Sequence, residues 1–383
     1  MSTGPFLAKG EVKAAGLADA GDFHKKFQDE VKKLPVGLRS AGIAIVDLTS
    51  GTPRYATTAQ QHIDKHIFSL AKLAPLIAVF RLRERLRNQF ATDSAKDSKE
   101  LIAKIEKAWK PEVEAKVKHR MATPDFPRLD RIFDLSGAAG RWSFNFIGEI
   151  ASGTAADTAK WKALQKIEDE EYNSDLLSIP KKVIEPLNFM DRLKLTIRMS
   201  DNMSAGSVAS DVGMAYMFGA LTTEGLYTVG SNGGHGLWLS NTYGFDKKNM
   251  GVEGSGSKGD LTSGGTAFSI AEYFTRLFHM KSLVDADGCK AMTEILKEKV
   301  SEGIGTASVL QRKGGLSKSR VTHSKIGIGW SRSEGCVVEA DITTKTGTAK
   351  RVRYIAVVLE VATANLPTVI NMMDAYVKTA NGA

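Results

Sequence analysis

The order of segment types predicts an α/β (α+β) protein with one antiparallel sheet built from both ends of the chain. Apolar segments of strand length occur in the first 68 residues and again after residue 300, whereas the apolar residues between them recur with helical spacing. Strands joined by short turns pair antiparallel, and helices must cover their apolar faces. We therefore expect a sheet lobe formed by residues 1–68 and 300–383, and a helical lobe formed by residues 69–299.

The N-terminal part of the sheet lobe is expected to contain one helix and two strands. Apolar residues recur with helical spacing from about Phe23 to Leu34, and an apolar segment follows from about Ser40 to Leu48. Ser50-Gly51 then marks a turn before a short second strand. These signals predict a hairpin.

The helical lobe is predicted to begin at Ser69. In its first helix Leu73, Leu76, Ile77 and Phe80 form an apolar face, and the polar faces carry Arg81, Arg83, Glu84 and Arg85. A second helical stretch is expected to be interrupted at Pro111, and a third contains Trp161, Leu164 and Ile167.

Residues 230–265 are too rich in Gly, Ser and Asn for continuous regular structure, and a loop of this length is often functional. Two further helical segments follow it. The chain then ends with three predicted strands and a helix, in the segments SKIGIGW, GCVVEADITT, RVRYIAVVLEV and LPTVINMMDAYVKT.

The composition is that of a globular protein, with 42% hydrophobic and 25% charged residues. No apolar run approaches the roughly 20 residues of a membrane helix, so we expect no membrane span. The net charge of +9 comes from basic residues scattered among acidic ones, without aromatic residues for base stacking, so we expect no nucleic-acid partner. Cys289 and Cys336 lack redox or zinc spacing and are expected to be buried thiols.

The N-terminal residues lack the continuous apolar stretch of a secretory signal. Two alternatives for the compartment follow. The protein is cytoplasmic if this N-terminus is native, and periplasmic or secreted if a leader was removed.

The candidate chemistry begins with Ser69 and Lys72. Helical residues three positions apart share a face, so the serine hydroxyl and the lysine amine are expected to meet. A lysine is a useful base only when its pKa is lowered, and the apolar residues around it supply the desolvation that this requires. Ser-x-x-Lys also occurs at Ser178–Lys181 and Ser255–Lys258, so this motif needs corroboration.

Two further motifs provide it: Ser200-Asp201-Asn202 lies between two helical segments, and Lys345-Thr346-Gly347 lies at the end of a predicted strand. Ser-x-x-Lys, Ser-Asp-Asn and Lys-Thr-Gly in this order are the motif set of class A β-lactamases and penicillin-binding proteins. The chain therefore resembles the penicillin-recognising serine hydrolases. The resemblance implies a β-lactamase/transpeptidase-like fold with an enlarged helical lobe.

The resemblance also implies a role for each motif residue. Ser69 would attack the substrate carbonyl, Lys72 would take its proton, Ser200 would relay a proton to the leaving nitrogen, and Asn202 would hold the substrate amide and Lys72. Lys345 and Thr346 would bind a substrate carboxylate, and Gly347 would allow close approach of the strand. The oxyanion hole would be formed by the backbone N–H groups of Ser69 and Thr348.

The expected substrate is accordingly a small molecule or peptide carrying a carboxylate, either a β-lactam or a D-alanyl peptide. The mechanism requires neither a metal nor a cofactor. An esterase or amidase on the same fold, and a sensor protein that is acylated once, are the alternatives. Ser143-Phe144-Asn145 competes with Ser200 for the second motif, and we prefer Ser200 because Asp201 completes the fuller match.

The chain departs from class A enzymes in two respects. The interval between Ser69 and Ser200 is enlarged, with the additional residues expected at about 92–175 as a lid, a partner surface or structural padding. No Glu-x-x-Leu-Asn motif for deacylation follows Ser200: Glu185-Pro186-Leu187-Asn188 is one residue short and precedes it, which leaves Glu253 as a candidate. We therefore expect acylation at Ser69 followed by slow deacylation.

Overall fold

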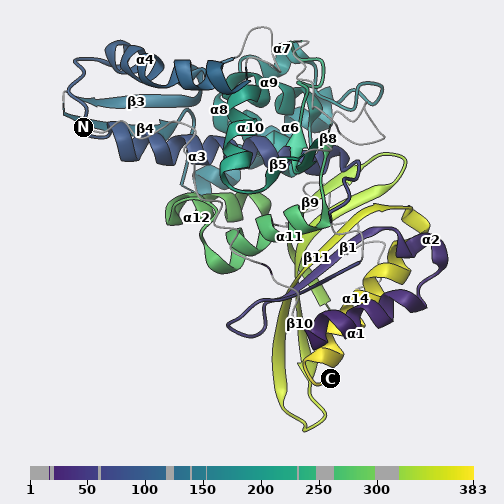
Figure 1. The fold of residues 1–383 in the computed structure, drawn as a ribbon. Coiled ribbons are helices and arrows are strands. Elements are labelled where there is room, and N and C mark those ends of the chain that lie inside the picture. Colours follow the sequence, from purple (N-terminus) through teal and green to yellow (C-terminus); the bar gives the residue numbers. More distant parts are fainter. Residues whose placement is uncertain are drawn as a thin grey trace.

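The structure is a computed structural model that describes residue 17 and residues 21–58, 62–117, 125–138, 140–151, 153–230, 233–246, 263–297 and 319–383. Figure 1 shows a sheet with helices on both of its faces, and a larger group of helices beside it.

The main sheet has five antiparallel strands in the order β2-β1-β11-β10-β9. Its strands are β1 (Gly42–Asp47), β2 (Arg54–Thr57), β9 (Ser319–Ile328), β10 (Arg332–Thr343) and β11 (Ala349–Val361). The first strand of the chain pairs with the last, in a register that runs from Gly42↔Leu359 to Asp47↔Tyr354. The prediction of an antiparallel sheet built from both ends of the chain is confirmed.

Both faces of this sheet are buried, as alternating side chains of β1 show. Ile43 and Ile45 belong to a core that includes residues of α1 (Asp22–Lys33) and α14 (Leu366–Ala380). Ala44 and Val46 face the opposite way, into the larger core with residues of α11 (Ala267–Thr275). Successive strand residues point to opposite faces, so an almost continuous apolar run is what a sheet covered on both sides requires.

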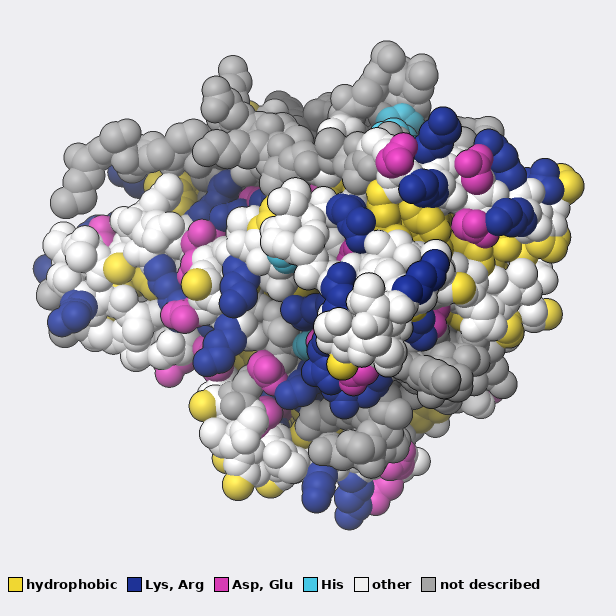
Figure 2. Space-filling view, turned by 90° about the horizontal axis from the view of Figure 1, so that it is seen from below, with side chains coloured by type: hydrophobic (Ala, Val, Ile, Leu, Met, Phe, Trp, Pro, Cys, Tyr) yellow, Lys and Arg dark blue, Asp and Glu magenta, His cyan; other side chains and the backbone are white. Residues whose placement is uncertain are grey.

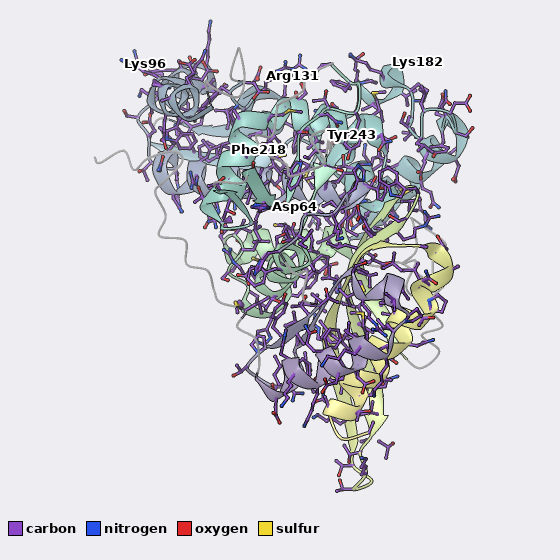
Figure 3. The ribbon with its side chains drawn as sticks, turned by 45° about the vertical axis from the view of Figure 1, so that its right-hand side comes forward. Asp64, Lys96, Arg131, Lys182, Phe218 and Tyr243 are labelled. Atoms are coloured by element: carbon purple, nitrogen blue, oxygen red, sulfur yellow. The ribbon has the colours of Figure 1, made fainter. Side chains whose placement is uncertain are left out.

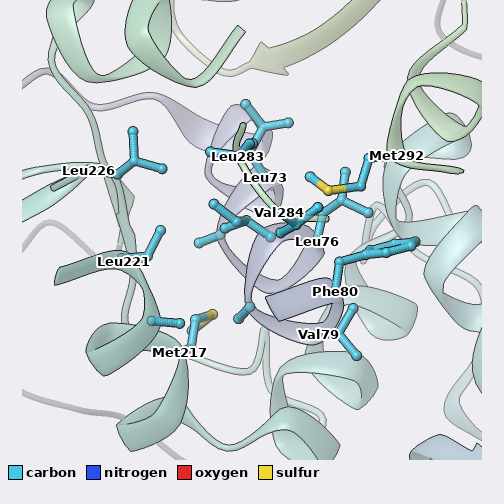
Figure 4. Close-up of a cluster of buried hydrophobic side chains, with 14 of the residues drawn as sticks. Leu73, Leu76, Val79, Phe80, Met217, Leu221, Leu226, Leu283, Val284 and Met292 are labelled. Carbon is cyan, nitrogen blue, oxygen red and sulfur yellow. The ribbon is translucent and has the colours of Figure 1, made fainter. Parts of the chain in front are cut away.

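Helix α3 (Leu73–Phe90) runs through the middle of the helical part. Figure 4 shows its Leu73, Leu76, Val79 and Phe80 among side chains from other helices and their connections. The remaining elements there are η1 (Phe68–Lys72), α4 (Ser98–Val117), α5 (Leu129–Ile132), α6 (Ala155–Glu171), α7 (Lys181–Ile184), α8 (Phe189–Lys194), η2 (Leu195–Met199), α9 (Asn202–Val212), α10 (Met214–Thr223), η3 (Arg276–Met280) and α12 (Ala286–Leu296).

Helix α3 is buried over more of its surface than its predicted apolar face alone. From Leu73 to Phe80 every residue is buried, because other elements surround this part of the helix. Two arginines from the expected polar faces are also largely covered and paired: Arg83 with Glu149 at 2.8 Å, and Arg81 with Glu224. A charge removed from water needs such a partner.

The expected interruption at Pro111 is wrong, because α4 continues from Ser98 to Val117 through the proline. Leu101, Ile105, Trp109 and Val113 are spaced by four residues and are all buried. Their shared packing outweighs the loss of one backbone hydrogen bond, which ordinarily costs a helix interior about 3 kcal/mol.

The segment at about 92–175, which we had expected to be a helical insertion, is not helical throughout. It contains a hairpin of β3 (Phe133–Ala138) and β4 (Arg141–Phe146). In β4 exposed and buried residues alternate, which is the period-two pattern of a strand with one covered face.

The Gly-rich segment contains short ladders. β5 (Tyr227–Gly230) pairs with β6 (Gly233–Gly236), and β7 (Trp238–Leu239) pairs with β8 (Ser263–Gly264). Residues 247–262 lie outside the described part, and Glu253 is among them.

Other features of the chain agree with the composition. Cys289 and Cys336 are buried and form no disulfide, as expected. None of the helices in the described ranges is both long and apolar enough to cross a membrane. On the face in Figure 2, Lys and Arg side chains are spread out with Asp and Glu among them.

We predict that Phe27→Ala lowers the free energy of unfolding by about 3–5 kcal/mol. Phe27 is fully buried in α1 and its ring packs edge-on against Tyr376, with 5.2 Å between ring centroids. Equilibrium urea unfolding measures the loss. Val36→Ala is the control, because Val36 is 75% exposed and its truncation should change stability by less than about 0.5 kcal/mol. Equal effects of the two changes would contradict the packing described.

Candidate active site

Ser69 and Lys72 lie in η1, a 3₁₀ helix that leads directly into α3. Residues three apart are eclipsed in a 3₁₀ helix, so the two side chains share one face. Phe68, which precedes Ser69, has a φ of 49°, uncommon for a residue with a side chain. Its ring packs against His66 and Trp330, with centroid distances of 4.2 and 4.6 Å. These contacts hold the turn that presents Ser69.

The Lys72 side chain is fully buried behind Ser69. Its ammonium donates to Asn202 Oδ1 at 2.7 Å and to the carbonyl oxygen of Ser200, and it lies 4.8 Å from the centre of the Tyr243 ring. Tyr243 lies among the helices in the upper part of Figure 3. Burial lowers the pKa of Lys72 to about 7, against the opposing effect of the Asp201 carboxylate. Lys72 can therefore lose its proton near neutral pH, as a general base must.

Ser200 and Asn202 are positioned by the residue between them. Asp201 caps α9: its Oδ2 accepts from the Ser204 N–H at 2.5 Å, and its Oδ1 accepts from the Ile179 N–H at 2.7 Å. Ser200 ends the π-helical turn η2 with a φ of 62°. The cap thus holds Ser200 and Asn202 at the beginning of a helix that packs against α3.

A second lysine, Lys325 on β9, approaches Ser200 from the sheet. It is 2% exposed, and its ammonium donates to Ser200 Oγ at 2.8 Å and to the Ile197 carbonyl at 3.0 Å. Strand β9 is the end strand of the sheet and packs against η1. At Gly327 a Cβ would lie 2.0 Å from the Ile67 carbonyl oxygen, so only glycine allows this close approach.

The structure contradicts the predicted placement of Lys345, Thr346, Gly347 and Thr348 at the site. They form the turn between β10 and β11, at the lower end of the sheet in Figure 1, whereas η1 packs against β9. The Gly347 N–H donates to the Thr344 carbonyl at 2.8 Å, and the Thr348 N–H donates to Thr344 Oγ1 at 3.1 Å. Gly347 has a φ of 81°, a conformation that favours glycine, so the turn itself accounts for a glycine at this position.

Lys325-Ile326-Gly327 occupies the position that we had given to Lys345-Thr346-Gly347. The sequence carries a weak signal for it, since a lysine is followed two residues later by glycine within the predicted strand segment SKIGIGW. Lys345-Thr346-Gly347 matches the motif exactly, but Thr and Gly at a strand end suit a tight turn equally well.

A cavity of about 500 Å³ opens at Ser69. Its described lining consists of Ser69, Glu168, Asp169, Tyr172, Leu177, Met199, Ser200, Asp201, Asn202, Ile326 and Ile328. This volume suits a small molecule or one end of a larger one.

Glu168, from α6, is a cavity residue that the sequence analysis missed. Burial, together with the nearby Asp201 and Asp169 carboxylates, raises its pKa to about 7. Its surroundings in the sequence, Ile167-Glu168-Asp169-Glu170-Glu171, are those of an exposed helix face. Only the packing of α6 beside η2 brings the carboxyl group to the cavity.

The competing motifs lie elsewhere. Ser143 is in β4, where its hydroxyl lies 2.8 Å from that of Ser136 on β3. Asn188 caps α8 by accepting from the Asp191 N–H at 2.9 Å. Among the described residues, no three His, Cys, Asp or Glu side chains gather as a metal site would require.

Comparisons with known proteins find structural likeness only. No protein-family model and no curated protein matches the sequence. Similar solved structures include the TLA-1 extended-spectrum β-lactamase, at 10% identity and a TM-score of 0.47, covering 94% of this chain and 99% of that one.

A class A β-lactamase from Bacteroides cellulosilyticus is similar at 12% identity and a TM-score of 0.46, covering 94% and 98% of the two chains. A penicillin-binding protein, PBP-A, captured as an acyl-enzyme with penicillin G, is similar at 14% identity and a TM-score of 0.45, covering 95% and 99%. At these identities and TM-scores the likeness is one of fold alone.

We predict that Lys325→Met slows acylation of Ser69 by about 10²-fold, the effect of losing one well-placed donor. The reason is that Lys325 holds the Ser200 hydroxyl. The rate of adduct formation with a reactive β-lactam, followed by stopped-flow or mass spectrometry, measures it. Lys345→Met is the matched control and should stay within about twofold of wild type, because Lys345 is exposed in a distant turn. A larger loss of acylation rate in Lys345→Met than in Lys325→Met would instead support the predicted placement of Lys345 at the site.

We also predict that the acylation rate rises with pH up to about 7 and then levels off. Burial lowers the pKa of Lys72, so the neutral amine that can accept a proton becomes the main form only above this pH. Below it, the rate should fall about tenfold per pH unit. Glu168 titrates in the same range, so the profile is repeated with Glu168→Gln. A rising limb that vanishes in this variant would assign the ionisation to Glu168 instead.

Proposed function

We propose that the protein is a serine hydrolase that acts on an amide or ester carbonyl through an acyl-enzyme at Ser69. The observation that carries this proposal is the buried ammonium of Lys72, bonded to Asn202 and Ser200 on the same face of η1 as Ser69. A buried lysine with a pKa of about 7 has little structural purpose there, but it is what a serine nucleophile needs.

In the first half of the reaction Ser69 Oγ attacks the carbonyl carbon and Lys72 Nζ takes its proton. The bond from that carbon to the leaving nitrogen or oxygen then breaks. Ser200 Oγ gives its proton to the leaving group and regains one from Lys72. The ammonium of Lys325, 2.8 Å from Ser200 Oγ, favours the negative charge that builds up on this oxygen during the relay.

In the second half, water attacks the acyl-enzyme and releases a carboxylic acid and free Ser69. The complete reaction consumes one water for each amide or ester bond cleaved. In the described part of the chain, no carboxylate is hydrogen-bonded to Ser69 or Lys72. We therefore retain the expectation that deacylation is slower than acylation, with Glu168 in the cavity as the described carboxyl group best placed to activate water.

The oxyanion hole in this proposal consists of the backbone N–H groups of Ser69 and Ile328. The Gly329 N–H donates to the Ser331 carbonyl at 3.1 Å across the β9–β10 turn. Successive strand N–H groups point in opposite directions, so that of Ile328 is directed to the free edge of β9, next to η1. This pair replaces the predicted pair of Ser69 and Thr348.

A β-lactam is the first substrate class to test, with a D-alanyl peptide as the second, because a strained amide reports acylation even when turnover is slow. An ester or amide of another class is favoured by the apolar side chains around the cavity opening.

We predict a covalent adduct between Ser69 and a penicillin whose carboxylate is esterified, with a mass increase equal to that of the whole molecule because opening its ring loses no atoms. Intact-protein mass spectrometry over time measures its formation and decay, and peptide mapping assigns the residue. Ser69→Ala should remove the adduct completely.

An adduct that persists in Ser69→Ala would contradict the assignment of the nucleophile. An adduct that disappears within seconds, with hydrolysed product accumulating, would contradict slow deacylation and would make Glu168→Gln the next variant to examine.

A further inference from the structure

Exposed apolar side chains gather around the opening of the Ser69 cavity. Seven large hydrophobic side chains are exposed in the described part of the chain, and five of them lie in two short segments, residues 172–177 and 328–330. These five, which we call the apolar mouth, are Tyr172 (45% exposed), Leu176 (60%), Leu177 (58%), Ile328 (45%) and Trp330 (76%). A concentration of this kind marks a surface that is covered by a ligand during function.

The apolar mouth is continuous with the place of reaction. Tyr172, Leu177 and Ile328 line the same cavity as Ser69, and Ile326 and Met199 extend the apolar lining inward. The Trp330 ring lies 4.6 Å, between centroids, from that of Phe68, the residue before Ser69. An apolar group bound along these side chains would therefore end at the nucleophile.

The charged groups of the cavity disfavour an anion. Glu168, Asp169 and Asp201 line it, and no Lys or Arg does so among the described residues. The nearby cation Lys325 is 2% exposed, with its ammonium bonded to Ser200 and the Ile197 carbonyl. On the strand that carries it, the residues that reach the cavity are Ile326 and Ile328, which offer no hydroxyl or charge. A carboxylate here would lose its hydration without gaining a partner.

Resting on the proposed acyl-transfer function of Ser69, we propose that the substrate is an uncharged ester or amide whose acyl group is an extended apolar chain lying along the apolar mouth. This replaces the expected substrate carboxylate, which depended on Lys345 and Thr346 being at the site. Chemically, Ser69 Oγ would take over the acyl chain, the alcohol or amine would leave with a proton, and water would release a fatty or similarly apolar acid.

The test uses 4-nitrophenyl esters of acetic, butyric, hexanoic and octanoic acids, together with the mono-ester of octanedioic acid. The last has the chain length of octanoate with a carboxylate at its end. Release of 4-nitrophenol is followed for the full chain, and the rate of Ser69→Ala is subtracted as background. We expect kcat/KM to rise by about two- to fourfold for each added methylene. The upper value corresponds to complete burial of that methylene. The octanedioate ester should react at least about tenfold more slowly than the octanoate ester.

Two variants connect this preference to the apolar mouth. Ile328→Thr keeps the β-branched shape but places a hydroxyl at the cavity, and it should lower the ratio of octanoate to acetate kcat/KM by about fivefold or more. Val36→Thr is the matched control, because Val36 is also an exposed β-branched residue but lies on α2 (Val36–Arg39), among the elements that cover the sheet. It should leave that ratio unchanged.

A small fluorophosphonate reacts with activated serines whatever their acyl preference. It therefore tests the acyl-transfer function of Ser69 separately from the assignment of an apolar substrate. Labelling of Ser69 together with flat chain-length dependence, preference for octanedioate, or no cleavage of the octanoate ester would overturn the substrate assignment and leave the acyl-transfer function standing. Absence of both labelling and Ser69-dependent ester cleavage would overturn both. Labelling with the expected chain-length and charge preference supports both.

Discussion

The interaction on which the proposed site depends is the enclosure of the Lys72 ammonium. An exposed lysine remains protonated at neutral pH and cannot accept a proton from serine. Here the surrounding elements exclude water from Lys72, and this burial lowers its pKa to about 7, although the Asn202 side chain and the Ser200 carbonyl accept hydrogen bonds from the ammonium. The burial of every residue from Leu73 to Phe80 is part of this arrangement, since η1 can present Lys72 to a dry interior only if the first half of α3 is covered on every side.

Two elements far apart in the sequence meet at Ser200, one from each side. Lys72 reaches its carbonyl oxygen from η1, and Lys325 reaches its hydroxyl from β9. Next to Ser200, the carboxylate oxygens of Asp201 accept hydrogen bonds from the backbone N–H groups of Ser204 and Ile179. Its main contribution is therefore to fix the backbone, and through it the positions of Ser200 and Asn202. Gly327 completes the arrangement by letting the sheet edge reach the nucleophile turn.

The additional chain between Ser69 and Ser200 contributes to the cavity as well as to the bulk of the helical part. Helix α6 and the residues after it bring Glu168, Asp169, Tyr172 and Leu177 to the cavity. The wall that they form is apolar near the opening and acidic beside it. In our proposal these residues take part in the choice of substrate, in addition to the roles as a lid, a partner surface or structural padding that the sequence leaves open.

The sequence by itself determined the sheet built from both ends of the chain, the helices between and the placement of Ser69 and Lys72 in one helical turn, because periodicity and spacing of three are local properties. It did not determine that α4 continues through Pro111, since the packing of Trp109 and Val113 decides this, nor which lysine meets Ser200. Lys345-Thr346-Gly347 and Lys325-Ile326-Gly327 each lie on or beside a strand, and local sequence ranks the first higher. Only the tertiary structure, which makes β9 the strand next to η1, places Lys325 at Ser200, because proximity between residues more than a hundred positions apart is set by strand order and packing.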